Sequence, residues 1–219
     1  MKNKNTILWQ KAKKIIPGGN QLLSKRPYLF TDDYWPTYFV KAKGCRVTDL
    51  ENKKYYDFSR MAVGACALGY SDKDVNSAVK KVVNNSNVST LNSPLEVELA
   101  EKLLEINKWA GMVRFARTGA EANSIAVRIA RAYTKKDKIL VCGYHGWQDW
   151  YISAVYKHES NINELLLPNI GTKGIPKQLS GLTIPFKYND LDNIKSLIMK
   201  NKGEVAAVFM ESEREEKPD

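Results

Sequence analysis

From about residue 112 onward, short apolar segments alternate with amphipathic helical segments, and this alternation restricts the possible folds strongly. The apolar segments are "MVRFA", "KILVCG", "LTIPF" and "VAAVFME", and we expect helices near residues 120–133 and 191–200. Strands that alternate with helices form a mostly parallel sheet that is covered on both faces. The pattern therefore predicts an α/β layer with flanking helices.

The first part of the chain has a different pattern. Apolar residues at helical spacing predict a helix over residues 6–16, which ends at Pro17-Gly18-Gly19. The stretch "TYFVKAKGCRVTDLENKKYYDFS" has turn residues between short strands and predicts a small antiparallel meander. The apolar, glycine-punctuated "MAVGACALGY" predicts a tightly packed loop that lies close to other backbone.

Two further helices are expected after this loop. Ser71 or Asp72 can cap a helix that extends to about Val83, and Ser93-Pro94 opens another through "LEVELAEKLLEINKW". We expect residues 1–70 to form a helix and β-meander that belong to a small domain, and residues 71–219 to form the larger domain. A last buried strand usually needs a covering helix on each face, so the early stop predicts that the larger domain is truncated at its C-terminal end.

The composition argues against several function classes. The 219 residues are 43% hydrophobic and carry a formal charge of +10, but the basic residues are spread along the chain and no nucleic-acid-binding motif is present. We therefore expect no nucleic-acid partner, and the positive charge suits an anionic cofactor or substrate. No apolar run is long enough to cross a bilayer, so we expect no membrane partner.

The cysteines and the N-terminus indicate the compartment. Three widely spaced cysteines without a CxxC pair fit buried thiols in a reducing environment, and the presence of only two histidines argues against a histidine-rich metal site. The N-terminal "MKNKNTILWQKAKKIIPGG" lacks the apolar core of a signal peptide. We expect a cytoplasmic protein without a bound metal.

A turn between a predicted strand and a predicted helix offers a site for an anion. In "RTGAEAN", Thr118, Gly119 and Ala120 lie at the expected helix N-terminus, where unpaired N–H groups and the helix dipole attract a phosphate. Gly119 permits close approach of the backbone. An ordinary strand-to-helix turn explains the same letters, because a single glycine is a much weaker signal than a P-loop.

A second loop ends at the same edge of the predicted sheet. The "GYHGW" sequence follows the strand "KILVC", and open α/β sheets bind ligands at the carboxyl ends of their strands. The ring of Tyr144 can stack on a flat heteroaromatic group. Taken alone, Tyr144 and Trp147 are more typical of a core or an interface; two loops at one edge favour a small ligand.

These two motifs, together with "IIPGGN", "KGCRVTDLENKKYYDF", "GACALGY" and "LNSPLEVELAEKLLE", resemble the class III aminotransferases of pyridoxal-phosphate (PLP) fold type I. Within that family the chain is most similar to the glutamate-1-semialdehyde 2,1-aminomutase-like branch, over most of its length. The resemblance implies that Gly119 and Ala120 bind the PLP phosphate through backbone N–H groups, with Thr118 at the usual serine position. It also implies that Tyr144 stacks on the pyridine ring.

The resemblance has further implications for the site. His145 and Gly146 are implied to shape the stacking loop. The family's Schiff-base lysine and the carboxylate on its pyridine nitrogen lie C-terminal to these motifs, so no catalytic residue is assigned in this chain. Glu211-Ser212 departs from the family's Glu-Pro. The branch holds a substrate carboxylate with a serine and an arginine after "PGG"; Ser24 and Arg26 are chemically suitable, although their spacing differs and a surface arginine also explains Arg26.

The implied activity is the movement of an amino group on a small carbonyl compound by a PLP-dependent aminotransferase or aminomutase, with a small-molecule amino donor and acceptor. The implied assembly is a homodimer with "MAVGACALGY" close to its interface. The alternative is a non-catalytic PLP- or phosphate-binding fragment or pseudoenzyme, because the lysine is not recognisable. Nucleic-acid binding ranks last.

Overall fold

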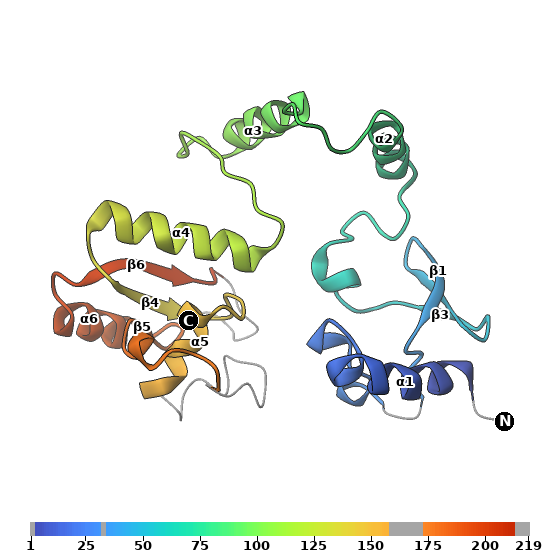
Figure 1. The fold of residues 1–219 in the computed structure, drawn as a ribbon, viewed down its shortest axis with the longest axis horizontal. Coiled ribbons are helices and arrows are strands. Elements are labelled where there is room, and N and C mark those ends of the chain that lie inside the picture. Colours follow the sequence, from blue (N-terminus) through green and yellow to red (C-terminus); the bar gives the residue numbers. More distant parts are fainter. Residues whose placement is uncertain (1–2, 32–33, 158–172, 213–219) are drawn as a thin grey trace. The chain divides into compact units, whose positions relative to one another are not determined.

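The computed structural model describes residues 3–31, 34–157 and 173–212 (Figure 1). The chain divides into two units, Met1–Leu99 and Ala100–Asp219. The predicted domain boundary at residue 70 stays a prediction. Among the described helices, none has the length and apolar character that a membrane span requires.

The first unit is built from helices and one small antiparallel sheet in the order β1-β2-β3. Its strands and principal helices are α1 (Lys4–Ile15), β1 (Phe39–Lys43), β2 (Arg46–Asp49), β3 (Lys54–Tyr56), α2 (Lys73–Asn84) and the start of α3 (Pro94–Ile106). The predicted N-terminal helix and meander are thus confirmed. The carboxylate of Asp72 accepts hydrogen bonds from the amides of Asp74 and Val75 and caps α2.

The segment "MAVGACALGY" packs against other backbone at its C-terminal end. Gly69 has φ +89° and lies against Gly44, since a Cβ on Gly69 would be 3.1 Å from the Gly44 Cα. Val63 and Leu68, in contrast, are 65% and 75% exposed. The predicted close approach to other backbone is therefore found at Gly69 and Tyr70, whereas the middle of the segment around Val63 and Leu68 is not packed within this unit. Cys45 is exposed, which corrects the expectation that all three thiols are buried.

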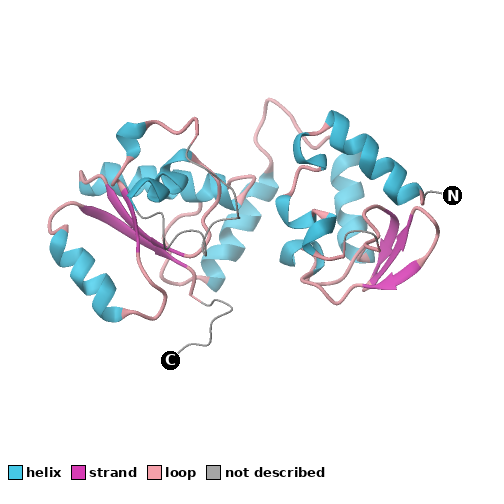
Figure 2. Ribbon diagram, turned by 90° about the horizontal axis from the view of Figure 1, so that it is seen from below, coloured by secondary structure: helices cyan, strands magenta, loops and turns pink. Residues whose placement is uncertain are grey.

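The second unit contains a parallel sheet in the order β5-β4-β6, so the first of its strands in the sequence is central. Figure 2 shows this sheet with helices around it. Its elements are α4 (Gly119–Thr134), β4 (Lys138–Cys142), α5 (Asp149–Ile152), β5 (Thr183–Pro185), α6 (Leu191–Lys200) and β6 (Val205–Met210). The predicted α/β layer with a parallel sheet is confirmed.

The central strand β4 sends alternate side chains into two separate cores. Ile139 and Val141 pack in one cluster with Val127 of α4 and with residues of α5. Leu140 and Cys142 belong to the other cluster, and residues of α6 pack against it. Because successive side chains of a strand point to opposite faces, α4 and α6 cover opposite sides of the sheet (Figure 1).

One predicted strand is absent. Residues 112–116, the "MVRFA" segment, are assigned to neither a helix nor a strand, and Met112 is 93% exposed. A strand requires a neighbour that supplies backbone hydrogen bonds, and none of the described strands pairs with this segment. The prediction was wrong here because an apolar pattern identifies a segment fit for a sheet but supplies no pairing partner.

Candidate functional site

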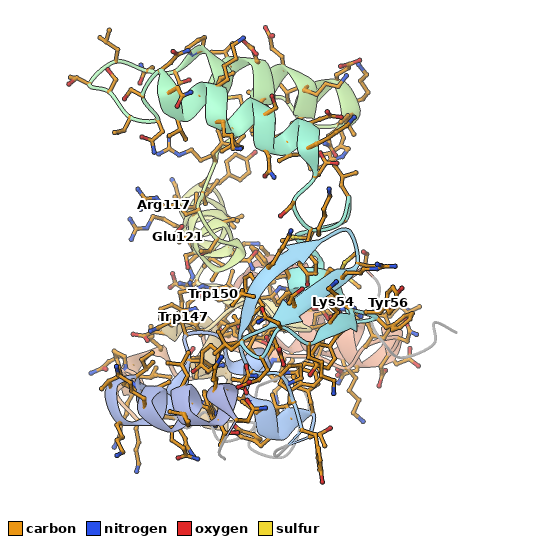
Figure 3. All side chains as sticks on the ribbon, turned by 90° about the vertical axis from the view of Figure 1, so that its right-hand side faces the viewer. Lys54, Tyr56, Arg117, Glu121, Trp147 and Trp150 are labelled. Atoms are coloured by element: carbon orange, nitrogen blue, oxygen red, sulfur yellow. The ribbon has the colours of Figure 1, made fainter. Side chains whose placement is uncertain are left out.

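The start of helix α4 is fixed by a reciprocal capping box. The hydroxyl of Thr118 accepts a hydrogen bond from the amide of Glu121, at 3.2 Å. The carboxylate of Glu121 in turn accepts from the amides of Thr118 and Arg117, at 3.1 and 2.9 Å. Figure 3 shows Arg117 and Glu121 together at this helix end. The box sets the first turn of the helix without using the amides of residues 119 and 120.

The amides of Gly119 and Ala120 are the donors that this turn leaves available. Within the part of the chain that the structure describes, neither amide donates a hydrogen bond. A Cβ on Gly119 would have no atom within 4 Å, so the space on that side of the residue is open. Unpaired N–H groups at a helix N-terminus, with the positive end of its dipole, bind anions such as phosphate.

The loop after β4 exposes Tyr144 and buries its neighbours. Gly143 and Gly146 have φ values of +92° and +115°, which side-chain-bearing residues rarely adopt. Tyr144 is 46% exposed and lies edge-on to Tyr151, with ring centroids 6.2 Å apart. His145 points inward, is 7% exposed and has its Nε2 2.8 Å from the Cys142 carbonyl oxygen. The Tyr144 ring is therefore in contact with Tyr151 on one side, and about half of the residue remains accessible to a ligand.

The two motifs meet in the folded unit. A Cβ on Gly146 would lie 2.7 Å from the Cβ of Ala120, so the loop packs directly on the first turn of α4. The amide group of Asn123 also reaches from α4 to the loop and donates to the His145 carbonyl at 3.0 Å. The open helix end and the exposed tyrosine therefore belong to one local structure at the carboxyl end of the central strand.

Several residues that support this structure were missed in the sequence analysis. Tyr151 donates to the Gly143 carbonyl at 2.5 Å, and the indole of Trp150 donates to the Ser124 hydroxyl at 3.1 Å. Asn123 is a third such residue. A local signal existed only for Glu121, whose position three residues after Thr118 is typical of a capping box. The others act through tertiary contacts, for which a single sequence carries no signal.

The side chain of Glu211 lies over the start of the loop. A Cβ on Gly143 would meet its Oε2 at 2.5 Å, and the Glu211 amide donates to the Cys142 carbonyl at 3.2 Å. This placement needs glycine at position 143. Within the described residues there is no group of three or more His, Cys, Asp or Glu side chains that could hold a metal ion.

An open hollow of about 600 Å³ lies along helix α4 and next to residues 115–117. Its lining is mainly apolar and also includes charged side chains; among the lining residues are Phe115, Arg117, Glu121, Ile125, Arg128 and Ile129. Gly119, Ala120 and Tyr144 do not line it. The hollow therefore adjoins the predicted phosphate turn, because Arg117 and Glu121 of the capping box line it, but it does not include the two amide donors.

The two residues predicted to bind a substrate carboxylate lie in the first unit. Ser24 is exposed in a short 3₁₀ turn, Leu23–Lys25. The guanidinium of Arg26 packs against Gly18, where a Cβ would approach Nη2 to 2.7 Å, and Nη1 donates to the Tyr28 hydroxyl at 2.8 Å. Gly18 of "PGG" thus makes room for Arg26. A role of Ser24 and Arg26 in substrate binding stays a prediction.

Comparison with known proteins decides the family. The family described as aminotransferase class-III matches residues 31–216. The chain belongs to this class-III aminotransferase family. It is 33% identical to a 3-aminobutyryl-CoA aminotransferase of Cloacimonas acidaminovorans (93% of this chain, 45% of that protein). It is also 33% identical to a glutamate-1-semialdehyde 2,1-aminomutase of Sulfurihydrogenibium sp. (95% and 47%).

The fold of this class-III family member is that of the PLP-dependent transferases of fold type I. A solved transaminase with PLP bound matches it with a TM-score of 0.79 at 27% identity, over 95% of this chain and 47% of that chain. The chain spans about half the length of the curated relatives it matches. The family resemblance deduced from the sequence motifs is thereby confirmed.

Proposed function

We propose that this chain supplies the phosphate and ring contacts of a PLP-dependent aminotransferase or aminomutase, which moves an amino group on a small carbonyl compound. The observation that carries the proposal is the packing of the Tyr144 loop on the open N-terminus of α4, at the contact between Gly146 and Ala120. One local structure thereby offers both amide donors for an anion and an accessible aromatic face.

The residues present fit this cofactor. The amides of Gly119 and Ala120 would hold the phosphate in the open space beside Gly119, and the hydroxyl of Thr118 can add a donor because its hydrogen bond with Glu121 uses only an acceptor position. Tyr144 would cover the pyridine ring, on a loop that His145 and Gly146 shape. When bound, PLP supplies an electron sink for the negative charge that develops beside the amino group.

The two relatives act on different substrates, so their names do not select one substrate class for this protein. One acts, by its name, on 3-aminobutyryl-CoA and the other on glutamate 1-semialdehyde. Each compound carries an amino or a carbonyl group, between which an amino group can be moved, and this shared chemistry is the part we propose for the whole protein. Ser24 and Arg26 remain our candidates for binding a substrate carboxylate. Because a Schiff-base lysine is not assigned in the chain, the second candidate function is PLP or phosphate binding without catalysis.

We further propose that the whole protein is a cytoplasmic homodimer and that the segment "MAVGACALGY", which contains Val63 and Leu68, lies near the interface. Both side chains are largely exposed within their unit. Light scattering after size-exclusion chromatography tests the assembly; a fully active monomer would contradict it.

The PLP site is best tested by removing one amide donor. Proline is tolerated at the first position of a helix and lacks the N–H group, and Thr118 has φ −134° and ψ 156°, which is compatible with a following proline. Gly119→Pro is therefore expected to leave α4 intact and to weaken PLP binding at least about tenfold, since a hydrogen bond to a charged group contributes roughly 1.5–3 kcal/mol.

Lys73→Pro is the matched control, because Lys73 is the first residue of α2 and follows Asp72 with φ −54° and ψ 133°. Equilibrium dialysis against PLP measures the affinity of each variant. Equal affinities for wild type and Gly119→Pro would refute the predicted phosphate site.

A further inference from the structure

The side chain of Asn123 joins the two halves of the proposed site. Its Nδ2 donates to the His145 carbonyl at 3.0 Å, across 22 residues of sequence. Asn123 lies one helical turn after Gly119 and Ala120, and His145 directly follows Tyr144. A single hydrogen bond thus connects the turn that carries the amide donors with the loop that carries the ring.

The neighbouring contacts hold the loop and helix α5 close to α4, so this hydrogen bond acts on a loop that has little freedom to move. Gly146 packs on Ala120 without room for a side chain, and its φ of +115° holds the loop in a conformation that only glycine adopts readily. Ser124, next to Asn123 on the helix, accepts from the Trp150 indole at 3.1 Å and donates to the Ala120 carbonyl at 3.0 Å. These contacts fix α5 on the helix, whereas Asn123 contacts the tyrosine loop itself.

We propose that Asn123 is a positioning residue that sets the spacing between the phosphate-binding amides and the Tyr144 ring. It touches no reacting group and acts through the His145 carbonyl. This inference rests on the proposed function for its consequence in PLP binding, but the restraint on the loop exists without a ligand. A rigid spacing lets a ligand that spans both halves bind more tightly, because no loop ordering is needed on binding.

The decisive variant is Asn123→Asp, which keeps the shape and replaces the donor by a carboxylate oxygen facing the His145 carbonyl. Asn123→Ala removes the donor without that repulsion and keeps the test valid if the aspartate variant does not fold. The matched control is Asn76→Asp, at an exposed asparagine in helix α2. Urea unfolding of all three variants records their overall stability.

Hydrogen exchange of the ligand-free chain is the first readout. We expect exchange in residues 143–148 to accelerate about fivefold or more in both Asn123 variants, the factor for one net hydrogen bond, with β4 and α6 unchanged. Unchanged loop exchange, or an increase spread evenly over the second unit, would overturn the proposal.

The second readout compares the affinities for PLP and for inorganic phosphate. This readout uses Asn123→Ala, because the carboxylate of Asn123→Asp lies one turn from the anion-binding amides and repels phosphate and PLP alike. Phosphate uses only the helix end, so its affinity for Asn123→Ala should stay within about twofold of wild type while that for PLP falls by about fivefold or more. A parallel loss of both affinities would overturn the positioning role. If wild type binds no PLP, the proposed function fails, and the hydrogen-exchange result still decides the role of Asn123.

Discussion

A Cβ placed on Gly146 would stand 2.7 Å from the Cβ and 3.2 Å from the Cα of Ala120. The first turn of α4 and the loop after β4 are therefore in contact through backbone and the smallest side chains. This contact brings together two motifs that are 26 residues apart in the sequence. Any residue larger than glycine at position 146 must move the loop away from the helix.

Gly146→Ala is accordingly expected to destabilise the second unit. The substitution combines the strain of φ +115° with the clash against Ala120, and we expect a loss of about 2–3 kcal/mol in the free energy of unfolding. Gly174→Ala separates these effects, because Gly174 has φ +87° and nothing within 4 Å of its Cβ position. Urea unfolding should give a loss of about 1 kcal/mol for this control. Equal losses in the two variants would mean that the contact is not tight.

The sequence predicted the helices better than the contacts between them. Asp72, Pro94 and Thr118 are local start signals, and the corresponding helices begin where these residues place them. The predicted strand at residues 112–116 was wrong because strand pairing depends on a distant neighbour. The contact of Asn123 with His145 also depends on how α4 packs on the sheet, and no spacing rule relates residues on different elements.

A hydrogen bond between Tyr70 and Asp57 should make the stability of the first unit pH-dependent. The Tyr70 hydroxyl donates to Asp57 Oδ2 at 2.6 Å. Burial, and secondly this bond, raise the pKa of Tyr70 to about 12. Although burial acts to raise the pKa of Asp57, the hydrogen bonds from Ser59 and Tyr70 lower it below its usual value.

The sign of each effect follows from these directions. Tyr70 has a higher pKa when folded, so its contribution is complete below about pH 10 and is lost as the pH rises towards about 12. Asp57 has a lower pKa when folded, so its contribution is present above about pH 4 and is lost as the pH falls. Stability should therefore decline at both ends of the range.

Tyr70→Phe tests this pair. We expect this variant to lose about 1 kcal/mol in the free energy of unfolding near neutral pH. Its stability should then fall less than that of wild type towards acidic and towards alkaline pH. Tyr133→Phe is the control, because Tyr133 is 88% exposed. Urea unfolding at acidic, neutral and alkaline pH measures the curves; a Tyr70→Phe curve parallel to wild type at all pH values would contradict the predicted linkage.

Asn5 should be a principal buried contact that holds helix α1 on the meander, beside the exposed bond from the Lys4 amide to the Glu51 carboxylate. It is 3% exposed, donates to Asp49 Oδ2 and accepts from the Tyr38 amide, each at 3.3 Å. Asn5→Ala leaves these buried groups short of a partner, so we expect a loss of about 1–3 kcal/mol in the free energy of unfolding. The exposed Gln10 on the same helix provides the control, Gln10→Ala. A loss no larger than that of the control would show that Asn5 does not anchor the helix.

The 219-residue chain should bind PLP weakly and catalyse no transamination, whereas a longer product that carries a Schiff-base lysine should do both. Phosphate contacts and ring stacking position the cofactor, but the reaction also requires a lysine that bonds to it and a carboxylate on the pyridine nitrogen. Lys187, two residues beyond β5, is exposed and offers a direct internal check. We expect Lys187→Ala to bind PLP as wild type does. Paired assays with PLP and an amino donor measure turnover, and activity in the short chain that is abolished by Lys187→Ala would place the chemistry within this chain.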